Sequence, residues 1–166
     1  MKLLFFTIGI LFSASVIAQA EFSGTWVLNE KQHISGPVYL NAMQTKMKVQ
    51  QSKDSIFIEY TNASADGKDA VSTQSLALDG KAITRIGATS KRKYIRKLEW
   101  SADKNQMIMT TVFYVPENDN EIDFTRIETW SISDGKLMVH KKSIETRSET
   151  WEVKGTFAHR QAQGDK

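Results

Sequence analysis

Apolar and polar positions alternate along most of the chain between Phe22 and Phe157. Alternation is typical of half-buried β-strands, and almost no long window carries apolar residues at helical spacing. In the first such segment Phe22, Gly24, Trp26 and Leu28 share one face. The pattern predicts about ten strands, near residues 22–28, 47–51, 56–60, 71–78, 81–86, 90–100, 106–115, 121–132, 136–145 and 149–159.

Short polar turns separate these segments. Asp79-Gly80 and Asp134-Gly135 are the strongest hairpin signals, because Asp and Gly tolerate the positive φ of a two-residue hairpin turn. Lys53 begins a third tight turn. Consecutive hairpins at this spacing predict an all-β barrel or sandwich. We favour a single antiparallel up-and-down β-barrel of about 8–10 strands, because closing the sheet removes its exposed edges.

One segment interrupts the alternation. Pro37 suits the first position of a helix, and Val38, Leu40 and Met43 follow at spacings that cover one end of a barrel. The sequence therefore predicts one short helix near the N-terminus, over residues 37–46, that acts as a lid. A connecting loop with a single helical turn is the alternative.

The first twenty residues have the features of an export signal. Lys2 precedes an apolar run over residues 3–12, and a small-x-small cleavage site ends at Ala20. The run is shorter than the ~20 residues of a spanning helix, so we expect cleavage and no transmembrane anchor afterwards. The expected product is periplasmic or secreted, with a barrel domain over residues 21–160 and a disordered tail over 161–166.

Cysteine content and charge narrow the classes of function. The chain has no cysteine, which excludes disulfides, thiolate metal ligands and cysteine nucleophiles. Without Lys2, 21 Lys and Arg face 19 Asp and Glu, a net charge of +2. So small a charge gives no reason to expect nucleic acid as a partner. The basic run over residues 91–97 is typical of a solvated strand face, and contact with a polyanion or an anionic membrane is its alternative.

The motif Phe22-Ser23-Gly24-Thr25-Trp26 opens the expected mature chain. It resembles the Gly-x-Trp motif that opens the first strand of lipocalin-like proteins of the calycin type, and the succession of hairpins is compatible with their fold. The resemblance implies that Trp26 closes the barrel floor and that Arg160 packs over it. Unlike the better-known members, this chain has no disulfide. A plain core aromatic is the alternative role for Trp26.

Alternation also predicts which side chains share the barrel interior with the tryptophans. An inward Trp100 places on its own face Leu98, Arg96, Tyr94 and Arg92. An inward Trp130 places on its own face Ile122, Phe124, Arg126, Glu128 and Ile132. An unpaired buried guanidinium is costly, and one glutamate can pair with only some of three arginines. The surplus of positive charge indicates a wet cavity that holds an anionic group.

The candidate ligand-binding residues are Arg92, Tyr94, Arg96, Tyr114, Arg126, Glu128 and Trp130. Arginine and tyrosine would hold a ligand carboxylate through charge-assisted hydrogen bonds, as in small intracellular fatty-acid carriers of related architecture. The alternative is that a bulge reverses the facing, or that the arginines lie near the barrel ends and extend into solvent.

Motifs of catalysis are absent from the sequence. It has no nucleophile elbow, no His-Glu-x-x-His and no phosphate-binding glycine loop, and His33, His140 and His159 are far apart. We therefore expect no enzyme activity, no cofactor and no metal. The sequence predicts an exported lipocalin-like barrel that binds a small hydrophobic or amphipathic, anionic molecule. The alternatives are an interaction module with a filled barrel, and an enzyme that uses a histidine–carboxylate site.

Overall fold

The computed structural model describes residues 19–64, 67–87 and 90–160. The expected signal peptide, except for its last two residues, and the expected tail over residues 161–166 lie outside these ranges. Within them the chain forms strands and no helix, so the all-β prediction is confirmed. None of the described segments is a helix of the length and apolar character needed to cross a membrane.

The described residues form one antiparallel sheet of ten strands in the order β4-β3-β2-β1-β10-β9-β8-β7-β6-β5. The strands are β1 (Gly24–Ser35), β2 (Lys46–Gln51), β3 (Ser55–Ala63), β4 (Asp69–Ala77), β5 (Ile83–Ile86), β6 (Lys93–Trp100), β7 (Gln106–Val115), β8 (Asn118–Ser133), β9 (Lys136–Glu145) and β10 (Trp151–His159). Except for β4 and β5, strands that follow one another in sequence are neighbours, and β1 also pairs with β10, so the up-and-down arrangement is confirmed.

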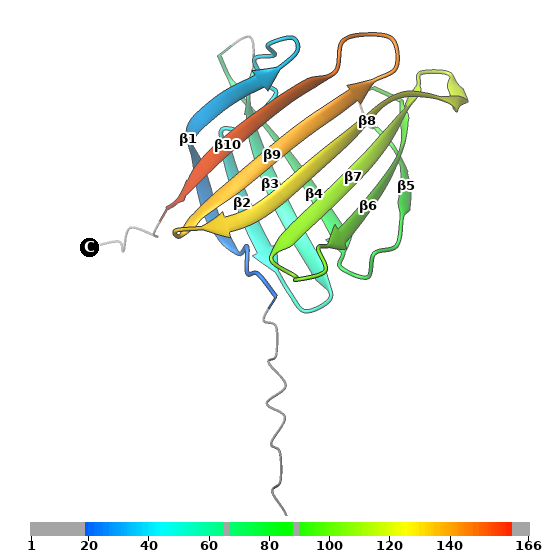
Figure 1. Ribbon diagram of the computed structural model, residues 1–166. Coiled ribbons are helices and arrows are strands. Elements are labelled where there is room, and N and C mark those ends of the chain that lie inside the picture. The colour runs from blue at the N-terminus through cyan, green and yellow to red at the C-terminus, as the bar shows by residue number, and fades with distance from the viewer. Residues whose placement is uncertain (1–18, 65–66, 88–89, 161–166) are drawn as a thin grey trace, which may run out of the picture.

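The sheet curls into a half-barrel. Figure 1 shows β10, β9, β8 and β7 in front of β2, β3 and β4, with the interior between these two parts. In the described residues β4 and β5 are the two outer strands of the sheet and do not pair with each other. The two elements that would close the barrel are therefore sequence neighbours that lie at opposite ends of one continuous sheet.

Two of the three predicted hairpin turns are confirmed. Asp134 and Gly135 have φ of 51° and 70° and join β8 to β9, and Lys53 lies in the tight turn between β2 and β3. The hairpin expected at Asp79-Gly80 is wrong. The Leu78 N–H donates to the Asp54 carbonyl at 2.9 Å, which extends the β3–β4 pairing to the β2–β3 turn, and the chain then crosses to β5, which pairs with β6 and not with β4.

The short helix predicted over residues 37–46 is wrong, and the alternative of a loop with one turn is confirmed. Three consecutive side chains, those of Ala42, Met43 and Gln44, are buried, which no single helical face allows. Met43 lies over Gly155 of β10, where a Cβ would come within 3.0 Å of its Cγ. The Thr45 N–H already donates to the β3 backbone at 2.9 Å, so the chain enters the sheet before a helix can form.

The apolar core fills one end of the interior. Phe22 is fully buried, stacks on Trp100 with ring centroids 5.8 Å apart and meets the edge of Trp130 at 5.9 Å. The Trp26 indole N–H donates to the Phe22 carbonyl at 2.8 Å. The aromatic residues of the opening motif and of the later strands thus form one cluster, which closes this end of the half-barrel.

The opening motif has a steric basis at its glycine. Gly24 has φ of 137°, and a Cβ there would lie 2.4 Å from Nε2 of His159. The His159 ring packs edge-on against Trp26 with centroids 4.9 Å apart. Arg160, expected over Trp26, is exposed and contributes a backbone N–H to the Thr25 carbonyl at 2.7 Å. The ring over Trp26 therefore comes from the residue before Arg160.

Candidate functional site

Cross-strand register arranges the inward side chains of β6 to β9 in four layers. The first layer is entirely apolar and consists of Trp100, Met107, Trp130 and Val139. The second layer introduces an ion pair and consists of Leu98, Met109, Glu128 and Lys141. The third is the most polar and consists of Arg96, Thr111, Arg126 and Ser143. The fourth consists of Tyr94, Phe113, Phe124 and Glu145. Polar side chains thus enter the interior at the second layer, beside the buried Leu98 and Met109.

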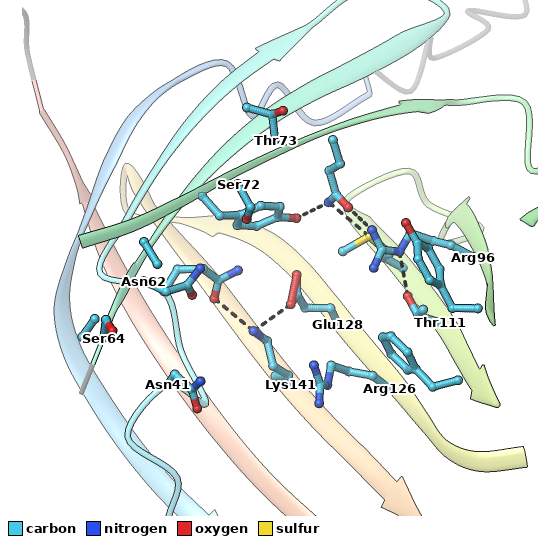
Figure 2. A pocket seen from close by; sticks show the side chains of 18 of the residues that line it. Asn41, Asn62, Ser64, Ser72, Thr73, Arg96, Thr111, Arg126, Glu128 and Lys141 are labelled. Carbon is cyan, nitrogen blue, oxygen red and sulfur yellow. Dashed lines mark hydrogen bonds and ion pairs between the residues drawn. The ribbon is translucent and has the colours of Figure 1, made fainter. Parts of the chain in front are cut away.

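Above that layer lies a pocket of about 790 Å³, which we call the main pocket. Figure 2 shows that its labelled side chains come from both sides of the curled sheet and from the loop that carries Asn41. Residues of the second to fourth layers, of β3 and β4, and of the loop line it; those used below are Asn41, Gln44, Tyr60, Gln74, Tyr94, Arg96, Met109, Thr111, Phe113, Arg126, Glu128 and Lys141. This volume is within the range of pockets that hold small organic ligands.

Glu128 and Lys141 form a buried ion pair in the floor of the main pocket. Lys141 Nζ lies 3.0 Å from Glu128 Oε2 and donates to Gln44 Oε1 at 3.0 Å, while the Trp130 indole donates to Glu128 at 3.3 Å. Burial alone would raise the pKa of Glu128, but Lys141, the indole N–H and Arg126 outweigh it and hold that pKa below the ordinary 4.5. Glu128 is therefore an ionised carboxylate committed to its own lysine.

Lys141 is the other half of that pair. Burial lowers the pKa of Lys141, and the nearby cations Arg126 and Arg96 lower it further, while the attraction of Glu128 opposes the shift. The positive charges in this pocket thus repel one another. An anion in the pocket would relieve that repulsion, so the electrostatics of the pocket favour a negatively charged ligand.

Arg96 belongs to a polar chain that crosses the interior. Its Nε donates to Thr111 Oγ1 at 2.8 Å, and its guanidinium also donates to Gln74, whose amide nitrogen in turn contacts the Tyr60 hydroxyl and, at 3.7 Å, Met109 Sδ. Burial raises the pKa of Tyr60 well above the ordinary 10.0, with Glu128 adding to the rise. Arg96 therefore has neutral partners that leave its positive charge uncompensated.

Arg126 has no such partners. Its guanidinium lies 5.5 Å from the ring centroid of Phe113, 5.1 Å from that of Phe124 and 5.3 Å from that of Trp151. Its Nε is buried without an acceptor, and within the described part of the chain it has no ion pair; no dashed line reaches it in Figure 2. Burial lowers the pKa of Arg126. Arg126 is therefore a half-buried cation held between rings, and its buried Nε donor has no acceptor in the described part of the chain.

The residues expected at the site divide into three groups. Tyr94, Arg96, Arg126 and Glu128 line the main pocket together. Trp130 is fully buried one layer below it, as part of the core. Two residues lie elsewhere and are described next.

Arg92 and Tyr114 do not line the pocket. Arg92 precedes β6, after a residue with φ of 51° that breaks the alternation, and it pairs with Asp123 at 2.7 Å. Tyr114 follows the inward Phe113 and so points to the other face of the sheet, where Lys93 Nζ lies 4.6 Å from the centroid of its ring. Ile122, also expected inside, is 45% exposed, because the β7–β8 register shifts next to Tyr114. Strict alternation therefore fails at this end of the sheet.

Sequence reasoning missed Lys141, Gln44, Gln74 and Tyr60. For Lys141 the signal was present, because Leu137 and Val139 alternate directly into it along β9. For Gln44 and Gln74 there was no comparable signal, because Gln44 lies in a loop and Gln74 in the outer strand β4. Their position depends on how far the sheet curls.

The one histidine–carboxylate contact among the described residues lies outside the main pocket. His140 Nε2 is 2.6 Å from Glu152 Oε1, and His140 alternates with the inward Val139 and Lys141. His33 Nε2 lies 2.7 Å from the Gly36 carbonyl. No group of three or more potential metal ligands occurs in the described ranges. The polar chemistry of the interior is therefore that of arginine, lysine, glutamate, tyrosine and amides.

No family model matches the chain, and the search of curated proteins finds no match either.

Proposed function

We propose that this protein is an exported, lipocalin-like barrel that binds a small amphipathic, anionic molecule in its interior without changing it. The observation that carries the proposal is Arg126: a half-buried guanidinium, with its Nε buried and without an acceptor, that faces a pocket of about 790 Å³. Burying such a group without an acceptor is costly, and a ligand anion is the acceptor it lacks.

The charge of the main pocket supports an anionic ligand. Arg96, Arg126 and Lys141 face one carboxylate, Glu128, a formal sum of +2. A carboxylate or similar group can accept two parallel N–H bonds from a guanidinium, which adds directionality to the charge attraction. The Phe113 and Tyr94 rings beside these cations provide apolar contact, so the lining favours a ligand with both an anion and an apolar part.

Two features support this reading over a barrel filled by its own side chains. The pocket is larger than a few hundred Å³, and side chains of the second to fourth layers line it, beyond the apolar first layer. For the lipocalin-like assignment, the support is the Gly24/Trp26 motif at the entry to a curled up-and-down sheet. A closed barrel and cleavage after Ala20 are parts of the same proposal.

The test is a titration of the protein with dodecanoate, a carboxylate amphiphile, in which isothermal titration calorimetry measures the affinity. We expect Arg126→Gln to weaken binding by at least about tenfold, the loss typical of one charge-assisted hydrogen-bonded contact. Arg92→Gln is the matched control, because Arg92 does not line the pocket, and it should leave the affinity unchanged. Equal affinities for wild type and Arg126→Gln would refute the proposal.

A further inference from the structure

Arg126 lies at the junction of two pockets. A second pocket of about 260 Å³, here called the side pocket, shares Asn41 and Arg126 with the main pocket. In Figure 2 Arg126 projects into the main pocket beside Glu128 and Lys141. An anion held by Arg126 therefore has space on two sides, and the two spaces differ in size.

The side pocket favours an uncharged group. Its walls include the rings of Tyr39, Phe124 and Trp151, with Tyr39 and Trp151 packed edge to face at 5.6 Å between centroids. It also contains the Glu145 carboxylate, whose Oε1 accepts from Ser143 at 2.6 Å and from the Trp151 indole at 3.1 Å. The carboxylate repels a ligand anion from this space and leaves it to a neutral, ring-sized substituent.

The charges of both pockets together favour a single negative charge on the ligand. Three cations, Arg96, Arg126 and Lys141, are set against two carboxylates, Glu128 and Glu145, a formal sum of +1. A monoanion brings this sum to zero, whereas a dianion such as a phosphate monoester reverses it. Uncompensated charge is costly in a partly desolvated site.

We infer, on the basis of the proposed function, that the ligand is a phosphodiester-type amphiphile. Its anion carries one charge and has a substituent on each side, which is what a guanidinium between two pockets accommodates. The larger, apolar substituent occupies the main pocket and a smaller neutral one the side pocket. A terminal carboxylate on Arg126 would leave one of the two spaces unfilled.

The inference is tested with two monoanions that carry the same tail. Dodecyl phenyl phosphate places a neutral ring beside its anion, and dodecanoate does not. We expect the diester to bind at least about tenfold more tightly, because the side pocket buries its ring. Trp151 forms a wall of that pocket, so only the diester should change its fluorescence. Diphenyl phosphate, which has no tail, distinguishes a lipid-type diester from a short soluble one by its weaker binding.

A variant that fills the side pocket completes the test. Ala42 lines the side pocket and not the main pocket, so Ala42→Leu should abolish the preference for the diester and leave dodecanoate binding intact. Tyr39→Trp, at a partly exposed position, serves the same purpose if Ala42→Leu does not fold. Equal binding of both monoanions with no effect of either variant would overturn this inference and leave the proposed function standing. No binding of either monoanion would count against the proposed function itself.

Discussion

At the residue scale, the account depends on how three cations are held in one interior. Lys141 pairs with a carboxylate and Arg96 has hydroxyl and amide partners, whereas in the described part of the chain Arg126 packs against aromatic rings and has no hydrogen bond or ion pair. Rings stabilise a guanidinium through their quadrupoles but do not accept its hydrogen bonds with the strength of an anion. This difference between Arg126 and its neighbours, and not the number of charges, is the reason that we propose Arg126 as the ligand position.

The ion pair beside Arg126 predicts how stability depends on pH. Removing one partner of a buried pair leaves the other uncompensated, so Glu128→Gln should lower the free energy of unfolding at pH 7 by about 3 kcal/mol. Because the folded-state pKa of Glu128 lies below 4.5, its contribution is present above that value and is lost as the pH falls through the folded-state pKa. The difference between wild type and Glu128→Gln should therefore shrink in acid.

Urea unfolding at a series of pH values measures this difference. Glu99→Gln is the control, since Glu99 pairs with Lys97 on the exposed face and such pairs contribute at most about 1 kcal/mol. A Glu128→Gln cost that stayed constant from pH 7 into strong acid would show that Glu128 is not ionised in the folded protein.

Alternation along single strands was sufficient to predict the inward residues wherever a strand is regular. It placed Tyr94, Arg96, Arg126 and Glu128 on interior faces, and all four line the main pocket. It failed for Arg92, where a positive φ precedes the strand. Partners from other strands, such as Lys141 for Glu128, follow from register, which no single strand encodes.

At the element scale, a row of hydrogen-bonded side chains through Gln74 connects the outer strand β4 to β6 across the interior. Gln74 contacts Tyr60 of β3 and Arg96 of β6, strands that are far apart in the sheet order. These contacts couple the outer edge of the sheet to its other side across the interior. They therefore help to set the curvature that creates the main pocket.

Removal of that connection should loosen β4. We expect Gln74→Ala to increase amide hydrogen exchange along β4 and to cost about 1–3 kcal/mol, because buried donors and acceptors lose their partner. Ser75→Ala, at the exposed neighbouring position, should leave exchange unchanged. Unaltered exchange in Gln74→Ala would mean that β4 is held by β3 alone.

The ten strands were predictable because each carries its own alternation and ends in polar turns. The lid helix predicted over residues 37–46 and the hairpin predicted at Asp79-Gly80 do not form, because contacts with residues distant in sequence decide the structure of both segments. Met43 is held over Gly155, and Leu78 is held beside the β2–β3 turn. Local signals such as a proline or an Asp-Gly pair give way to such contacts.

At the scale of the whole molecule, one sheet provides both a core and a binding pocket. The aromatic cluster around Phe22 and Trp130 closes one end, and three polar layers follow it along the same strands. The aromatic cluster and the polar pocket are therefore separated along the strand direction. The antiparallel up-and-down sheet was predictable from sequence, whereas its extent of closure was not, because closure depends on the combined curvature of the eight strands between β4 and β5.

The most direct test of the central claim is native mass spectrometry of the protein purified under mild conditions from the cells that make it. We expect a mature chain that begins at Glu21 and carries one small anionic amphiphile, and we expect Arg126→Gln to lose that added mass while Arg92→Gln retains it. A protein free of any bound molecule, which also takes up none from a mixed lipid extract, would contradict the account.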